Sequence, residues 1–98
     1  MDKPYTVEEI KKISIPIAKR YGVGRMALFG SYARGDHTVN SDIDFLIEKG
    51  RIRGLEFFAF INSLEDAFGI SVDVLTYDSL RDSLIADAIS DEVVLYER

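Results

Sequence analysis

The chain has 98 residues, of which 47% are hydrophobic, no Cys and a formal net charge of −5. This length fits one domain, 1–98, with a real hydrophobic core and little room for a separate substrate-recognition domain. The lack of Cys excludes disulfides, thiolate metal sites and thiol nucleophiles, and suits a reducing cytoplasm. Because the chain is acidic and has no apolar run near the ~20 residues of a membrane span, we expect a soluble cytoplasmic protein that binds neither nucleic acid directly nor a membrane.

The first predicted element is a helix that ends at Gly22. Thr6 followed by Glu9 forms a capping-box pattern at its start. Pro16 lies inside the segment, where a proline costs about 3 kcal/mol, so we expect a kink or a break just before it. The apolar side chains that recur at helical spacing are Ile10, Ile13 and Ile17.

Two strands and a loop are predicted next. Residues 25–29 form a short apolar run bounded by glycines, which is typical of a buried strand. Residues 30–41 are rich in Gly, Ser, Asp and Asn and should be loop with at most a short helical turn. Residues 42–48 have the length and β-branched character of a second strand, which the glycines at 50 and 54 bring to an end.

The second half of the chain predicts two more helices around a third strand. Residues 55–68 place apolar side chains on one helical face, residues 71–76 form a strand, and residues 80–89 have amphipathic helical spacing. Residues 93–96 form either a last short strand or an extended tail. The element order predicts an α+β fold with a small central mixed β-sheet covered by helices.

Three aspartates lie on the second and third predicted strands. Asp42 and Asp44 point to the same side of their strand because side chains alternate between its faces. Asp73, between two valines, can join them if the third strand lies beside the second. Carboxylates held this close repel one another unless a cation or a proton neutralises them. Magnesium prefers oxygen ligands, and two such ions can clamp both oxygens of a phosphoryl displacement, so we expect a Mg²⁺ site.

Gly30 and Ser31, at the end of the first strand, supply the complementary half of such a site. A glycine lets the backbone approach a phosphate closely, and the following amides and hydroxyl can donate to its oxygens. Gly-Ser alone is a weak signal. Its weight comes from the combination with the Asp-x-Asp pattern ten residues later and the isolated Asp73 one strand further on.

This combination resembles the DNA polymerase beta-like nucleotidyltransferase superfamily, through Gly30-Ser31, the ten-residue gap and Asp42-Ile43-Asp44. The wider strings at 28–36 and 41–47 are similar to its smallest branch, the minimal nucleotidyltransferases (MNT), and the similarity covers almost the whole chain. In that branch the domain is typically an antitoxin, paired with a HEPN-domain toxin that is an RNase. It can silence the toxin by attaching AMP to a tyrosine.

The resemblance implies a role for each of six residues. Asp42 and Asp44 would hold two Mg²⁺ ions, and Asp73 would complete one metal site and help to deprotonate the acceptor hydroxyl. Gly30 and Ser31 would hold the triphosphate of ATP or a related nucleotide. Arg34 is a candidate phosphate or acceptor contact, with a solvated loop arginine as the equal alternative.

Other interpretations remain open from the sequence. A contact-only antitoxin would neutralise its partner without catalysis, and the acceptor could instead be a small molecule or an RNA end. The only histidine, His37, is expected to be a solvated loop residue. Tyr32 either packs or is exposed without a role, or it contacts the nucleotide or an acceptor. The aromatic residues near 57–60 are expected to be mostly core, with one of them a candidate partner contact.

Overall fold

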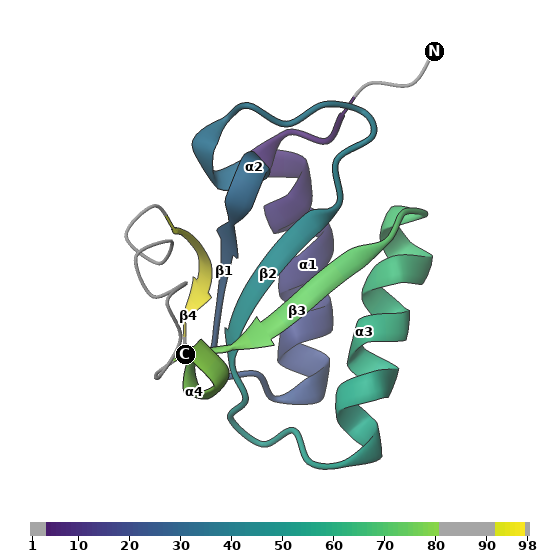
Figure 1. Cartoon of the computed structure of the whole chain (residues 1–98). Helices are drawn as coiled ribbons and strands as arrows, with labels where there is room; N and C mark the ends of the chain where they lie inside the picture. Colours follow the sequence, from purple (N-terminus) through teal and green to yellow (C-terminus); the bar gives the residue numbers. More distant parts are fainter. Residues whose placement is uncertain (1–3, 81–91, 98) are drawn as a thin grey trace.

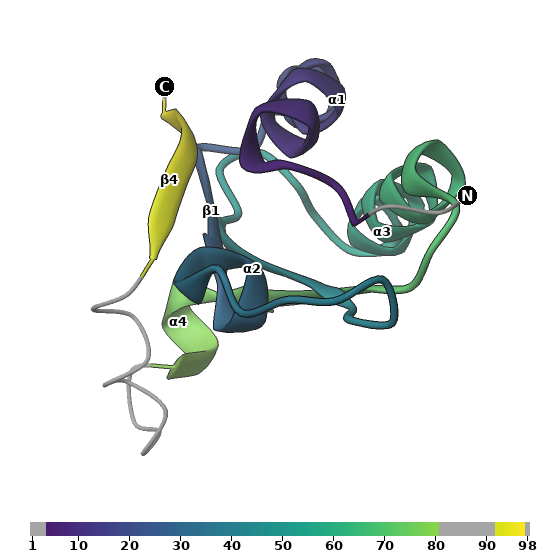
Figure 2. The same ribbon diagram turned by 90° about the horizontal axis from the view of Figure 1, so that it is seen from above.

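The structure is a computed structural model that describes residues 4–80 and 92–97. In this part of the chain four strands form one sheet in the order β3-β2-β1-β4. Helices α1 and α3 lie side by side on one face of the sheet, and α4 lies on the other (Figures 1 and 2). The elements are α1 (Val7–Tyr21), β1 (Arg25–Phe29), α2 (Gly30–Arg34), β2 (Ile43–Glu48), α3 (Leu55–Phe68), β3 (Val72–Thr76), α4 (Tyr77–Leu80) and β4 (Val93–Glu97).

This architecture confirms the predicted mixed α/β fold with a central sheet. β1 pairs antiparallel with both β2 and β4, whereas β2 and β3 are parallel. Nearly all of the helix predicted at 80–89 falls outside the described residues. Among the residues that are described, no helix combines the length and the apolar character needed to cross a membrane.

Helix α1 begins as its capping box predicts. The Glu9 amide donates to the Thr6 hydroxyl at 3.1 Å, and the Thr6 amide donates to the Glu9 carboxylate at 2.9 Å. The predicted break before Pro16 is wrong, because the helix runs on to Tyr21. Pro16 is exposed while Ile17 on the core side is buried. Burial of the core-facing side chains therefore offsets the local cost of the proline.

The alternation of side chains along β2 separates the core from the site. Three apolar residues of this strand, Ile43, Phe45 and Ile47, are fully buried in the core cluster that includes residues of α1 and α3. Asp44, between the first two, therefore points to the opposite face of the sheet. Asp42, expected as the first strand residue, instead lies immediately before β2 and is exposed.

The last strand is held in place by an ionic cluster at its start. Arg25 of β1 donates to the Tyr77 hydroxyl and to the Glu92 carboxylate, both at 2.8 Å, and the Tyr77 hydroxyl donates to Glu92 at 2.6 Å. These contacts join β1, the start of α4 and the residue preceding β4. Residues 93–97 pair with β1, so the end of the chain forms a strand and not the extended tail that the sequence left as the alternative.

Candidate active site

Asp44 and Asp73 occupy paired positions of the parallel strands β2 and β3. Their carboxyl groups are hydrogen-bonded to each other. Asp44 is half-buried and Asp73 is exposed. A carboxyl pair in contact on one face of a sheet is the arrangement that a shared proton or a cation can stabilise.

The surroundings of Asp44 raise its pKa to about 6. Burial is the largest cause, followed by the hydrogen bond to Asp73 and the negative charges of Asp73 and Asp42, while the positive charge of Arg34 acts in the opposite direction. Each of the raising effects disfavours the charged carboxylate. Near neutral pH the site therefore holds negative charge at a cost that a bound cation would remove.

We expect this cost to appear as a pH-dependent stability difference between the native protein and the Asp44→Asn variant. Between about pH 4 and 6 folded Asp44 keeps a proton that the unfolded chain has lost, so the stability of the native protein falls as the pH rises through this window. Because the side chain is only half-buried, water screens the effect, and we expect Asp44→Asn to be more stable by about 1 kcal/mol at pH 7 and by almost nothing near pH 4.

Urea unfolding in metal-free buffer at several pH values measures this difference. The matched control is Glu48→Gln, which removes an exposed carboxylate from the same strand. A stability difference for Asp44→Asn that stays constant from pH 4 to 7 would show that the negative charge of Asp44 does not destabilise the folded protein. The same profile for both variants would assign the effect to net charge rather than to the Asp44 site.

Gly30 packs directly against Asp44. It has φ +70°, in the left-handed region, and a Cβ atom at this position would collide with the Asp44 Oδ2 atom. Phe29, the preceding residue, is the partner of Asp44 in the β1–β2 register. The absence of a side chain at position 30 therefore lets the backbone leave β1 directly above the carboxylate pair, and Ser31 follows at once in α2.

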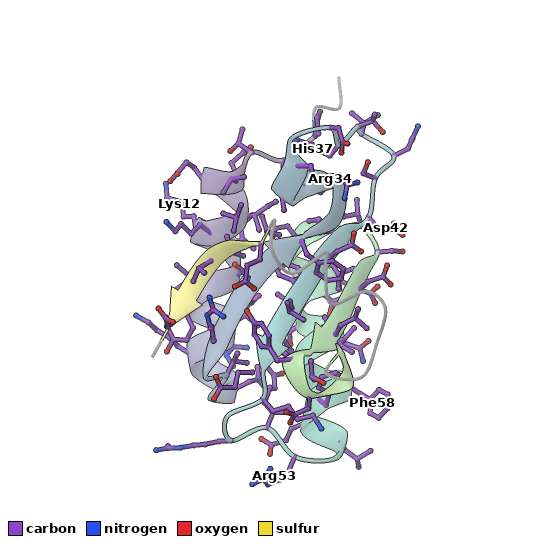
Figure 3. All side chains as sticks on the ribbon, turned by 60° about the vertical axis from the view of Figure 1, so that its left-hand side comes forward. Lys12, Arg34, His37, Asp42, Arg53 and Phe58 are labelled. Atoms are coloured by element: carbon purple, nitrogen blue, oxygen red, sulfur yellow. The ribbon has the colours of Figure 1, made fainter. Side chains whose placement is uncertain are left out.

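The structure thus brings together Gly30, Asp44 and Asp73, and places the remaining predicted residues around them. Asp42 and Arg34 are close enough to act on the charge of Asp44. Arg34 is exposed and forms an ion pair with Asp36 at 3.3 Å. It therefore faces solvent, at the same end of the molecule as Asp42 (Figure 3).

The donor set suits Mg²⁺ without forming a closed cage. Within residues 4–80 and 92–97, no three His, Cys, Asp or Glu side chains gather as a ready-made metal site. Two touching carboxylates with a third nearby offer only oxygen ligands, and Mg²⁺ is commonly held by one or two carboxylates together with substrate phosphates. The residues present therefore fit a metal ion whose coordination is completed by a bound nucleotide.

Two aromatic positions differ in part from the sequence expectation. His37 lies in the loop as expected but is half-buried rather than solvated: its ring stacks on that of Tyr32 with centroids 4.0 Å apart, and its Nδ1 atom is buried with no partner in the described part of the molecule. Tyr32 is 2% exposed, as expected for a packing residue. Nothing local in the sequence signals this stack, because it depends on how residues 35–37 turn back over α2.

Comparisons with known proteins agree with this geometry. Residues 8–96 match the family model described as a nucleotidyltransferase domain. A Methanocaldococcus jannaschii protein that carries the provisional name protein adenylyltransferase MJ0435 is 43% identical over 89 residues, with 90% of this chain and 95% of the relative covered. Protein adenylyltransferase MntA of Thermococcus cleftensis is 36% identical over 94 residues, which cover 91% of this chain and 94% of that protein.

Solved structures show the same fold. A chain provisionally described as a minimal nucleotidyltransferase superposes with a TM-score of 0.72 at 26% identity, covering 91% of this chain and 95% of its own length. A chain from the complex of tri-AMPylated Shewanella oneidensis HEPN toxin with MNT antitoxin superposes with a TM-score of 0.69 at 17% identity, covering 95% of this chain and 74% of that one. This chain therefore belongs to the nucleotidyltransferase domain family, as an enzyme of its minimal nucleotidyltransferase branch.

Proposed function

We propose that this enzyme transfers AMP from ATP to a tyrosine hydroxyl of a HEPN-domain toxin, and thereby acts as its antitoxin in the cytoplasm. The observation that carries the proposal is the contact of Asp44 with Asp73 beneath Gly30. The names of the relatives support protein adenylylation, and the tri-AMPylated toxin in the Shewanella complex supports the class of acceptor. The resemblance of the motifs to MNT antitoxins supports the tyrosine.

In the proposed site Asp42, Asp44 and Asp73 would hold two Mg²⁺ ions together with the triphosphate, which completes the coordination. When bound, Mg²⁺ would neutralise the charge that builds up on the phosphate oxygens during transfer. The raised pKa of Asp44 supports this assignment, because burial and the neighbouring carboxylates disfavour its negative charge, which a bound cation would stabilise. The exposed position of Asp73, on the outer strand β3, leaves room for an acceptor beside it.

The proposed reaction is an in-line displacement at the α-phosphorus of ATP. The tyrosine oxygen forms a bond to this phosphorus, the bond to the oxygen that bridges the α- and β-phosphates breaks, and pyrophosphate leaves. Asp73 takes the proton of the attacking hydroxyl. Gly30 and Ser31 hold the triphosphate through backbone amides and the serine hydroxyl, and Arg34 contacts a phosphate or the acceptor.

Incubating the purified enzyme with magnesium, α-labelled nucleoside triphosphates and a lysate of its source organism tests the proposal. We expect label from ATP on one protein, which mass spectrometry identifies as a HEPN-domain protein modified on tyrosine. Label on RNA or on a small molecule would contradict the proposed acceptor, and a preference for another triphosphate would contradict ATP. Magnesium-nucleotide binding without any transfer would favour the contact-only antitoxin.

A further inference from the structure

Helix α3 carries apolar side chains on the face that points away from the core. Leu55 is 83% and Phe58 62% exposed, and Ala59, Asn62 and Asp66 are exposed as well. Their spacing places these five residues on one stripe of the helix, which we call the outer face of α3. No element of the described chain covers this stripe, since α3 is the outermost helix, with α1 on one side and β3 below it (Figures 1 and 2).

The two ends of the outer face carry opposite charges. Arg51 and Arg53, both exposed, precede the first turn of α3. Asp66, near its end, lies with Glu65 on the rim of a hollow of about 490 Å³. The last turn of α3 contains no basic residue. Negative charge at the end of a helix opposes the helix dipole, so Asp66 costs stability in a single copy, whereas Glu56 in the first turn interacts favourably with the dipole.

We propose that two copies of this chain associate through the outer face of α3, with the two helices antiparallel about a two-fold axis. In this arrangement Arg53 of each copy lies beside Asp66 and the acidic hollow of the other. Leu55 and Phe58 of each copy pack on the small central residues of the second helix, Ala59 and Asn62. The end of each α3 also lies beside the positive start of the partner helix, which offsets the cost of Asp66 in the single copy.

Charge complementarity favours a second copy as the occupant of this surface. Basic residues lie just before the stripe and an acidic residue lies at its end, so this surface is complementary to itself when it is turned by a two-fold rotation. A contact between two 14-residue helices, each about 21 Å long, is small for a protein interface, so the dimer should be weak and sensitive to salt.

The proposal does not depend on the proposed function. Phe58 and Arg53 lie at the end of the molecule opposite Asp42 and Arg34 (Figure 3). The acidic end of α3 lies nearer to β3, but Asp44 points to the face of the sheet opposite α1 and α3, so the carboxylate pair stays open in the dimer. Transfer activity and dimerisation can then fail separately, and a dimer without transfer would leave this inference intact.

Sedimentation velocity over a wide range of protein concentrations at low salt tests the dimer. The mass should rise from that of the 11.1 kDa chain to twice this value as the concentration increases, and high salt should reverse the change. Phe58→Glu should weaken association at least about tenfold. The control Lys12→Glu reverses an exposed charge on α1 and should leave association unchanged. A native chain that stays at 11.1 kDa throughout would overturn the proposal.

A charge exchange tests the antiparallel pairing itself. Arg53→Glu alone places two acids opposite each other, and Asp66→Lys alone places two bases opposite each other, so each variant by itself should remain monomeric. An equimolar mixture of the two variants restores an opposite-charge pair at both ends and should form a mixed dimer. Failure of the mixture to associate, with both variants folded by circular dichroism, would overturn the antiparallel arrangement.

Discussion

Replacing Asp44 by alanine is expected to lower nucleotidyl transfer about a thousandfold or more, without loss of the fold. The variant removes the side chain that contacts both Asp73 and the Gly30 backbone position, and hence the centre of the proposed metal site. Loss of the several kcal/mol that a metal site contributes to the transition state corresponds to this factor. The initial rate of label transfer from α-labelled ATP measures the effect.

The matched control for this loss is Glu48→Ala, which truncates an exposed carboxylate of the same strand and should keep the native rate. Thermal unfolding in metal-free buffer at neutral pH should show Asp44→Ala to be at least as stable as the native chain, because the charge cost of the pair is gone. A folded Asp44→Ala variant with the full transfer rate would refute the assignment of the site.

The same variant distinguishes enzymatic from contact-only neutralisation of a toxin. If chemistry is required, Asp44→Ala should still form the complex with the toxin but leave its RNase activity intact. If neutralisation persists in this variant, or in the complete absence of nucleotide, contact alone is sufficient. Complex formation measured by gel filtration, beside an RNase assay on the same sample, gives both answers.

Gly30→Ala should lower both transfer and stability, for two separable reasons. The left-handed backbone at φ +70° costs an alanine about 1 to 2 kcal/mol of stability. The new methyl group would also collide with Asp44 Oδ2 and displace this carboxylate. Because a displacement of about 1 Å in a reacting geometry can cost about 10²-fold in rate, we expect a rate loss of that order.

Gly35→Ala provides the control that separates the two reasons. Gly35 also has a positive φ, +82°, but a Cβ atom there would meet nothing within 4 Å. Its substitution should cost similar stability and leave the transfer rate close to native. Pyrophosphate release measures the transfer rate of both variants, and urea unfolding measures their stability. Equal rate losses for the two alanines would show that the contact of Gly30 with Asp44 does not matter for catalysis.

Elements with strong local signals could be predicted from the sequence almost to the residue. The capping box of Thr6 and Glu9 fixes the start of α1, and the apolar spacing of residues 55–68 matches α3. These signals act within a few residues of one another, so no knowledge of the rest of the fold is needed to use them. Gly30-Ser31 and the Asp-x-Asp pattern are also local signals, and the sequence alone singles them out as candidate site residues.

Tertiary structure decided the features that depend on distant neighbours. Pro16 does not break α1, because the core buries both halves of this helix. The conformation of residues 93–97 depends on pairing with β1, and the stack of His37 on Tyr32 depends on a loop path that no local pattern encodes. Sequence propensities are weak compared with the free energy of packing, so each of these outcomes follows from contacts that only the folded chain makes.

The candidate site shows the same division. By itself, the sequence determined which side chains are candidates for a phosphoryl-transfer site, because carboxylate chemistry and the alternation along a strand are local properties. Only the tertiary structure decided that Asp44 and Asp73 face each other, that Gly30 packs on Asp44 and that Asp42 lies just outside the strand. The physical reason is that strand order and register are set by burial of Ile43, Phe45 and Ile47 beneath α1 and α3, and a shift by one residue would turn every carboxylate to the other face.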